Sequence, residues 1–394
     1  MKRILAAVLA AALLAGSCLA APAAAQEPLN YSNVREQLLA SNPQLKTISI
    51  NIDGAKSSIR EIDRNAALTT SFDAINAQIS AINAAEMDAV ASGNPLSAAQ
   101  LAENKAKIAQ LQQQQSALLS SASQLYSTRD SLKTSLESLR FTKRSTLELL
   151  VYSAQTLISA QYQLQNQEKQ LTQTEADFAR QQKIAVAMYR VGRATDSDLK
   201  ALEYQKDTLD HTRQTLARQK NSLSSQLNLL LARDFEAPLT FAEFKLTEPK
   251  NENGEALSAD DYETLLAAAL DVNIDIAAQR YTYENSTRFS ATYRAAEEKL
   301  SELKRQFKAD FNTAFYDVFD AEDSLRLERN TLTQKQDALR TAELRYQRGY
   351  CSANEYAAAQ SAVTMQELAV SNAEIQYQNA VLKLEAFQNG GWPK

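Results

Sequence analysis

Histidine and cysteine, which often act as metal ligands or in nucleophilic catalysis, are scarce in this chain, with one histidine and two cysteines. The one histidine, His211, lies in a strongly polar stretch with no cluster of cysteines, histidines or carboxylates at metal-ligand spacing around it. Cys351 has no neighbouring histidine or lysine to lower the pKa of its thiol, which predicts an inert residue. The sequence also lacks a nucleophile–base pair and a phosphate-binding glycine loop. We therefore expect no enzymatic activity, no metal and no cofactor.

A ten-residue pattern that occurs twice is a stronger signal. Residues 189–198 (YRVGRATDSD) recur as residues 346–355 (YQRGYCSANE), with their glycines 157 positions apart (349 − 192). Gly192 and Gly349 suit the left-handed conformation that ends many helices, because glycine has no Cβ. Each copy therefore predicts the tight turn of a helical hairpin.

Both copies also contain the signal that starts a new helix. Thr195 and Ser352 follow their glycines by three residues, and Asp198 and Glu355 stand three residues further on. A hydroxyl residue followed at this spacing by an acid is the pattern of a capping box, in which the two side chains satisfy free backbone N–H groups. The sequence thus predicts helix, turn and helix in each copy.

Composition excludes several classes of protein. The 394 residues include 42 lysines and arginines against 47 aspartates and glutamates, for a formal charge of −5, so the basic surface of a nucleic-acid-binding protein is missing. Only 8 glycines and 7 prolines are present, and aromatic residues make up 7%. This composition is low in breakers and favours long helices over a compact globular enzyme.

The first residues have the features of an export signal. Residues 1–25 combine a positively charged start, an apolar stretch and the small-residue cleavage site at 23–25. A lipoprotein-type box that ends at Cys18 is the alternative, although Ala15 stands where leucine is usual in such a box. No other stretch has the length of apolar sequence that a membrane-spanning helix needs. We expect an exported protein.

Spans without glycine or proline predict where uninterrupted helices run. These spans are 96–191, 193–237, 255–348 and 350–389. Within the first, leucines recur every seven residues from Leu111 to Leu139, as in a helix that packs along a neighbour. A weaker turn at 285–287 divides the third span into helices near 262–284 and 288–347.

The chain is predicted to be all-α, with two tandem repeats of long antiparallel coiled-coil hairpins. The expected boundaries are 26–233 for the first repeat, 234–257 for an irregular linker, 258–389 for the second repeat and 390–394 for a C-terminal tail. Asn42 and Asn273 lie at similar positions near the start of each repeat, 231 residues apart (273 − 42). The glycine turns are only 157 residues apart, so the first repeat has 74 more residues between its start and its glycine turn (231 − 157). Two extra helical arms account for them. The glycine turns should lie together at one end, with the arms at the other.

This arrangement resembles the TolC family of outer-membrane efflux proteins. The resemblance covers nearly the whole mature chain and rests on the two Tyr-x-x-Gly tips, the Asn-x-x-Leu/Ile openings and the closing helices near 196–233 and 354–388. It implies a homotrimer whose helices form a tube, with a periplasmic-adaptor-like protein and an inner-membrane pump as partners. The tips that would dock the adaptor comprise Val191, Gly192, Arg193 and Thr195 in the first copy, and Arg348, Gly349, Tyr350 and Ser352 in the second.

The resemblance also assigns Asp198, Tyr346 and Glu355 to closing the entrance of the tube. Two alternatives remain for Asp198 and Glu355: each acid only caps its helix, or each caps its helix and also helps to close the entrance. Tyr346 is a packing residue on sequence grounds, and only the resemblance gives it a further role.

The transmembrane strands of the TolC family have no counterpart in this sequence. Residues 45–97 and 276–312 are rich in Ala, Gln, Glu and Lys and predict helix rather than strands of alternating polarity. We therefore expect a TolC-like protomer without a β-barrel and with no direct membrane span. It belongs in the outer membrane or periplasm by resemblance, or on the extracytoplasmic face of the cell membrane. Two functions follow: a duct component that docks a pump adaptor, or alternatively an exported coiled-coil scaffold with no conducting role.

Overall fold

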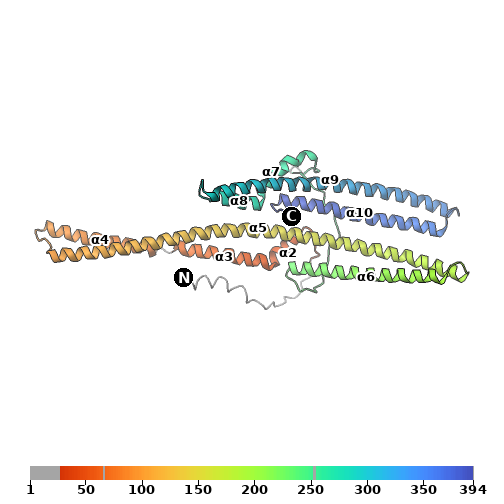
Figure 1. Ribbon diagram of the computed structural model, residues 1–394, viewed down its shortest axis with the longest axis horizontal. Helices are drawn as coiled ribbons and strands as arrows, with labels where there is room; N and C mark the ends of the chain where they lie inside the picture. Colours follow the sequence, from red (N-terminus) through yellow and green to blue (C-terminus); the bar gives the residue numbers. More distant parts are fainter. Residues whose placement is uncertain (1–26, 65–66, 252–253, 394) are drawn as a thin grey trace.

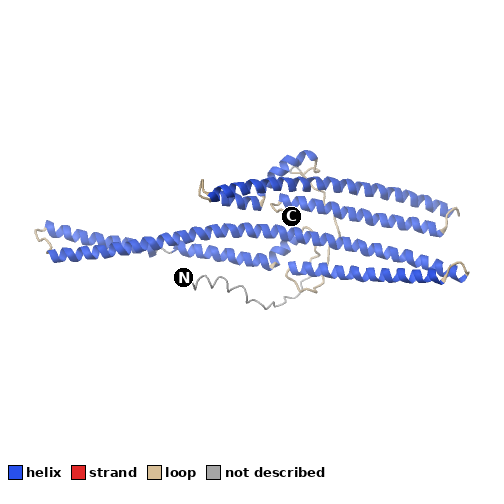
Figure 2. Cartoon of the chain, viewed as in Figure 1, coloured by secondary structure: helices blue, strands red, loops and turns tan. Residues whose placement is uncertain are grey.

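The structure, a computed structural model, describes residues 27–64, 67–251 and 254–393, so the predicted signal peptide lies outside the described residues. Their regular structure is helical, with two isolated bridges and no strand in these ranges (Figure 2). The helices are α2 (Val34–Ser41), α3 (Pro43–Arg64), α4 (Ala67–Ala91), α5 (Ala98–Arg190), α6 (Asp196–Leu230), η1 (Ala259–Asp261), α7 (Tyr262–Val272), α8 (Ile274–Glu284), α9 (Ala291–Gln347) and α10 (Ala353–Gln388). The predicted all-α fold is confirmed.

The longest element is α5, whose 93 residues contain no glycine or proline. At 1.5 Å per residue it is about 140 Å long. The helix begins at a capping box, in which Ser97 accepts a hydrogen bond from the Gln100 backbone N–H while the Gln100 side chain accepts one from Ser97. Gly93, with a φ of +73°, forms the preceding turn. Local capping therefore fixes the start of a helix that runs the length of the first repeat.

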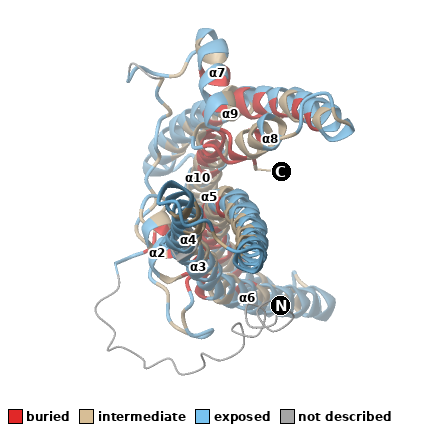
Figure 3. Ribbon diagram, turned by 90° about the vertical axis from the view of Figure 1, so that its left-hand side faces the viewer, coloured by how far each residue is buried: buried red, intermediate tan, exposed pale blue. Residues whose placement is uncertain are grey.

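Long helices from the two repeats lie side by side in one layer. α9 packs on α10, α10 on α5, and α5 on α6, so α9 and α6 are the opposite edges. Further from the glycine turns, α3 lies on α5 and α8 lies on α9. Figure 3, turned by 90° from Figure 1, shows these helices spread in a row rather than gathered in one bundle.

Each repeat has its own apolar core. In the second, Phe307, Phe311 and Phe315 recur every four residues on α9 and are fully buried. The rings of Phe307 and Phe311 pack against Phe387 of α10, and Phe315 stacks on Phe311. In the first, the core joins α2 to α5 and α6. The repeats meet along α5 and α10, where the buried Asn166 amide donates to side chains of α10 at 2.9 and 3.0 Å. Burial of apolar area stabilises each repeat, while polar bonds help to align the two.

A buried asparagine marks the same joint in each repeat. Asn42 caps α3 through its Oδ1, and its amide donates to the carbonyl of Leu230 at the end of α6 (2.8 Å). Asn273 caps α8 in the same way and donates to the carbonyl of Gly391, just beyond α10 (3.3 Å). Both asparagines therefore tie the opening helices of a repeat to the end of its closing helix. This matching pair of contacts is a structural sign of the predicted repeat.

Two predicted helices end differently from the sequence expectation. The helix expected at 262–284 is divided into α7 and α8 at Asn273, whose ψ of 126° is not helical. The helix expected from 288 begins at Ala291, because Phe289 adopts a left-handed φ of +64° and Ser290 is the N-cap. The predicted turn at 285–287 is otherwise present, since α8 ends at Glu284.

The C-terminal residues are packed rather than free. Trp392 is 9% exposed, lies 5.4 Å from the ring of Phe307, and its Nε1–H donates to Asp310 Oδ2 at 2.8 Å. The carbonyl of Gly390 accepts a hydrogen bond from the Ile274 backbone N–H (3.0 Å). The tail therefore joins α10 to the α7–α8 joint and to α9.

The two glycine turns lie at the same end of the long axis, and α4 with the start of α5 extends from the opposite end (Figure 1). This confirms the predicted placement of the glycine turns at one end and of the extra arms of the first repeat at the other. Among the described residues, no helix has the combined length and apolar character needed to cross a bilayer.

Candidate docking site at the hairpin tips

Both hairpin tips have the same backbone geometry. Gly192 and Gly349 have φ values of +72° and +75°, the left-handed region that glycine adopts without a Cβ penalty. In the first tip, the N–H groups of Gly192 and Arg193 donate to the carbonyls of Tyr189 and Met188 at 3.0 and 2.8 Å. This pair of bonds is a Schellman motif, which satisfies carbonyls left free at the helix end.

The second tip repeats these bonds residue for residue. Gly349 donates to the carbonyl of Tyr346 (3.0 Å), and Tyr350 donates to the carbonyl of Arg345 (2.8 Å). A Cβ added at Gly192 or Gly349 meets no atom within 4 Å, so the glycines are required by conformation and not by crowding. The two turns are therefore rigid and equivalent.

The predicted capping boxes are present in both tips. Asp198 accepts hydrogen bonds from the backbone N–H and the hydroxyl of Thr195 at 2.7 and 2.8 Å. Glu355 accepts the same pair from Ser352 at 2.7 and 2.9 Å. These bonds, from the backbone first and the hydroxyl second, hold the pKa of Asp198 and of Glu355 below the ordinary carboxylate values. Both acids are thus held at the helix starts as charged caps.

The tyrosines that open the two patterns differ in their contacts. The Tyr189 hydroxyl donates to Asp196 at 2.7 Å, and this bond raises the pKa of Tyr189. Tyr346 instead stacks on Tyr356, with ring centroids 5.2 Å apart and planes 6° from parallel. In both tips the tyrosine braces the last turn of one helix against the first turn of the next. The Asp196 and Tyr356 contacts were not predicted, although both residues lie within one helical turn of the caps.

The apex of each tip exposes an apolar side chain beside an arginine. Val191 is 67% exposed in the first tip, and Tyr350 is 80% exposed in the second. Arg193 and Arg348 stand next to the two glycines and are exposed, and neither forms an ion pair with another described residue. Aromatic and arginine side chains are enriched where proteins bind one another. Since the acids are engaged as caps, the apex offers an apolar and cationic surface.

All eleven candidate residues are exposed and lie in these two turns or the adjoining helix ends: Val191, Gly192, Arg193, Thr195, Asp198, Tyr346, Arg348, Gly349, Tyr350, Ser352 and Glu355. Cys351, between them, is half-buried, and burial followed by the nearby Glu355 carboxylate raises the pKa of its thiol. A raised pKa lowers the reactivity of a thiol, which agrees with the inert residue inferred from sequence.

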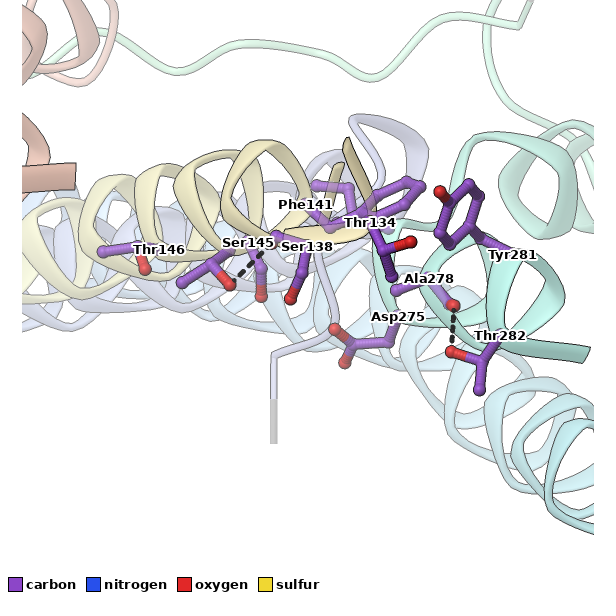
Figure 4. Close-up of a pocket in the computed structure, with 11 residues that line it drawn as sticks. Thr134, Ser138, Phe141, Ser145, Thr146, Asp275, Ala278, Tyr281 and Thr282 are labelled. Atoms are coloured by element: carbon purple, nitrogen blue, oxygen red, sulfur yellow. Dashed lines mark hydrogen bonds between the residues drawn. The ribbon is translucent and has the colours of Figure 1, made fainter. Parts of the chain in front are cut away.

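Elsewhere, a groove of about 400 Å³ lies between α5 and α8 (Figure 4). Hydroxyl side chains dominate its walls, among them Ser138 and Ser145 of α5 and Thr282 of α8. Asp275 is the one charged residue of this lining. A single carboxylate among hydroxyls has no base or metal-binding partner for catalysis. No group of three or more metal-ligating side chains occurs in the part of the chain that the structure describes.

Comparison with known proteins gives a match at the level of structure. No family model matches the sequence, and no curated protein does. The outer membrane protein VceC of Vibrio cholerae superimposes with a TM-score of 0.51 over 92% of this chain and 97% of its own, at 13% identity. The chain shares the fold of VceC. A membrane protein from Pseudomonas aeruginosa matches over 92% of this chain and 90% of its own, at 16% identity and a TM-score of 0.47.

The likeness to VceC covers both repeats, because it spans nearly the whole of each chain. At 13% identity it establishes the fold alone. The role of the tips must therefore be argued from the residues of this chain.

Proposed function

We propose that this chain is an efflux-duct component of the cell envelope. Copies assemble side by side, as a homotrimer, into a helical tube, and the hairpin tips dock an adaptor-like protein that connects the tube to a pump. The observation that carries the proposal is the single layer of helices with two open edges and both hairpin tips at one end. The fold shared with VceC, an outer membrane protein, supports the envelope location.

The open layer supports assembly because its edges are incompletely covered. Tyr204 and Leu229 on the α6 edge are 72% and 71% exposed, and Leu327 and Leu344 on the α9 edge are 63% and 49% exposed. Apolar side chains on both edges gain from contact with a neighbouring copy, since burial of apolar area is favourable. Joining the α9 edge of one copy to the α6 edge of the next repeats the same contact around a closed ring.

The tips support docking because they present recognition groups on a rigid frame. Schellman bonds and capping boxes fix both turns, so binding does not require ordering of a loop. Their apex exposes Val191 and Tyr350 with Arg193 and Arg348 alongside. A partner with apolar and acidic residues at its end complements this surface. In the proposed tube, Asp198, Tyr346 and Glu355 line the same end and narrow the entrance.

Docking is tested by recovery of partners from the native envelope on purified variants. Arg193→Asp and Tyr350→Asp each reverse or remove one feature of the apex. Arg288→Asp and Phe289→Asp make comparable changes at exposed positions of the α8–α9 turn, outside the tips and outside the α6 edge. Recovery of an adaptor-like partner should fall for the two tip variants and stay at the wild-type level for the controls. Circular dichroism checks that all four are folded. Equal recovery from all proteins would leave the tips as ordinary turns and favour the scaffold hypothesis.

A further inference from the structure

We infer that the end opposite the tips is a second interface between copies of this chain. The arm, defined as α4 with residues 98–127 of α5, extends beyond the second repeat (Figure 1). Its end groove takes the arm of a neighbouring copy. The inference rests on the proposed ring, which places all arms at one height around a common axis.

The groove lies where α4 turns into α5. Its volume is about 650 Å³, and its lining is largely apolar. Met87 and Val90 on α4 are 72% and 69% exposed, and Pro95, Leu96 and Leu101 complete the apolar lining. Large exposed apolar patches on soluble proteins mark interaction sites. The end of the arm thus has a surface that favours being covered.

The flanks of the arm have unusually few charges. α4 has three charged residues among its 25, and residues 108–128 of α5 have none. The first 25 residues of α6 (196–220), at the tip end of the same repeat, contain ten. Helix faces that stay in water are commonly about 25–35% charged. The contrast within one repeat indicates that the arm packs against further protein.

The few charges that the arm has are divided between its two helices. α4 contains Asp73, Glu86 and Asp88 and no basic residue, whereas the start of α5 contains Lys105 and Lys107 together with Glu103, which pairs with Lys107. One carboxylate oxygen of Glu86, Oε1, is buried at the groove without a hydrogen-bond partner. Lys105 is exposed and forms no ion pair with a described residue.

A second copy of the chain supplies a lysine for the Glu86 carboxylate and an apolar cover for the groove. In a ring, each contact is head to tail, so the α4 flank of one arm faces the α5 flank of the next. Lys105 of one copy is then in position to pair with the Glu86 carboxylate of its neighbour, while the apolar residues of the groove are covered. A lipid surface fits less well, because the arm has four acidic residues against two lysines and its net negative charge opposes anionic headgroups.

The test places a photo-activated benzophenone side chain at Met87 of the full-length mature protein. Unlabelled and ¹⁵N-labelled proteins are mixed, denatured together and refolded, so that cross-links between copies carry both isotopes. We expect isotopically mixed products that map to residues 98–127 of the second copy. The same probe at Tyr204 on the α6 edge reports ring closure independently of the arm.

The outcomes separate the two proposals. Cross-links between copies at Tyr204 without any at Met87 would overturn the arm interface and leave the ring standing. No cross-links between copies from either position would overturn both. Attachment of the Met87 probe to lipid in phosphatidylethanolamine–phosphatidylglycerol vesicles, with none to protein, would assign the groove to a membrane surface and also overturn the inference.

A charge exchange tests the pairing itself. Glu86→Lys and Lys105→Glu should each lower the yield of Met87 cross-links roughly twofold to fivefold, the range expected for one exposed ion pair. The double variant should restore the yield, because the pair is re-formed in the opposite sense. Lys107→Glu is the matched control, since Lys107 already pairs with Glu103 in its own helix at 2.8 Å. Failure of the double variant to recover would refute the assigned contact.

Discussion

Gly390→Ala should release the C-terminal tail from its site. Gly390 has a φ of +86°, and a Cβ added there lies 2.5 Å from the carbonyl oxygen of Val272 and 3.5 Å from Ile274. The left-handed conformation costs a non-glycine residue roughly 1–2 kcal/mol, and crowding in a packed site typically costs about 1–3 kcal/mol more. The change therefore destabilises the docked tail by about 2–5 kcal/mol.

Gly192→Ala is the matched control. Gly192 has a φ of +72°, close to that of Gly390, but an added Cβ meets nothing within 4 Å. Its cost is thus the conformational part alone, about 1–2 kcal/mol. Because the tip is remote from the tail, the control leaves the tail docked.

Fluorescence gives a direct assay, since Trp392 is the only tryptophan of the chain. Docked Trp392 is 9% exposed, so wild type should emit as a buried indole. Gly390→Ala should shift this emission to longer wavelength and increase its quenching by iodide, and Gly192→Ala should change neither. Equal emission from all three proteins would refute the steric reasoning, as would the same shift in both variants.

Other predictions concern the caps and a buried acid. Thr195→Ala and Ser352→Ala should each cost about 1 kcal/mol of local stability, because each removes a capping side chain, and faster hydrogen exchange in the first turns of α6 and α10 measures the effect. The capping acids have lowered pKa values, so their stabilising contribution is present above the unfolded-state pKa and is lost as pH falls through the folded value. Protection of these turns from exchange, relative to the intrinsic rate at each pH, should fall over the same range. Burial raises the pKa of Glu385, which makes its charged form unfavourable in the folded protein. At pH values above the raised pKa, Glu385→Gln should therefore increase the free energy of unfolding measured in urea. This gain should vanish below the ordinary glutamate pKa, and a gain independent of pH would contradict the assignment.

Local signals in the sequence were enough to predict the helix ends at both hairpin tips. Gly192 and Gly349 adopt the left-handed conformation, and the capping boxes at Thr195 and Ser352 are formed as predicted. These features depend on residues within one turn of each other, so their spacing is visible in the sequence.

Features that depend on distant contacts were not predictable in this way. The break at Asn273 has no glycine or proline beside it, and the Asn273 side chain donates to Gly391, 118 residues away. Trp392 had no assigned role because its partner, Asp310, lies 82 residues earlier. The end of α6 is similar, since Ala232 takes a left-handed φ of +52° without being glycine. Tertiary packing decides all three.

In the candidate site, too, local features were predictable from the sequence and contacts across the turn were not. The capping boxes of both tips were predictable from residue spacing, and their hydrogen bonds are present in the structure. The stacking of Tyr346 on Tyr356 was missed, because an aromatic pair across a turn has no fixed spacing signature. Whether the tips bind a partner depends on a second protein and stays a prediction.

Assembly of copies into a closed tube sets the mass of the purified mature protein in solution. Light scattering coupled to size exclusion, at several protein concentrations, measures that mass without reference to shape, which matters for a molecule with a helix about 140 Å long. We expect three chains per particle, each at or below the 43.5 kDa of the full sequence. A mass of one chain at every concentration would contradict it, because a single open layer cannot enclose a duct.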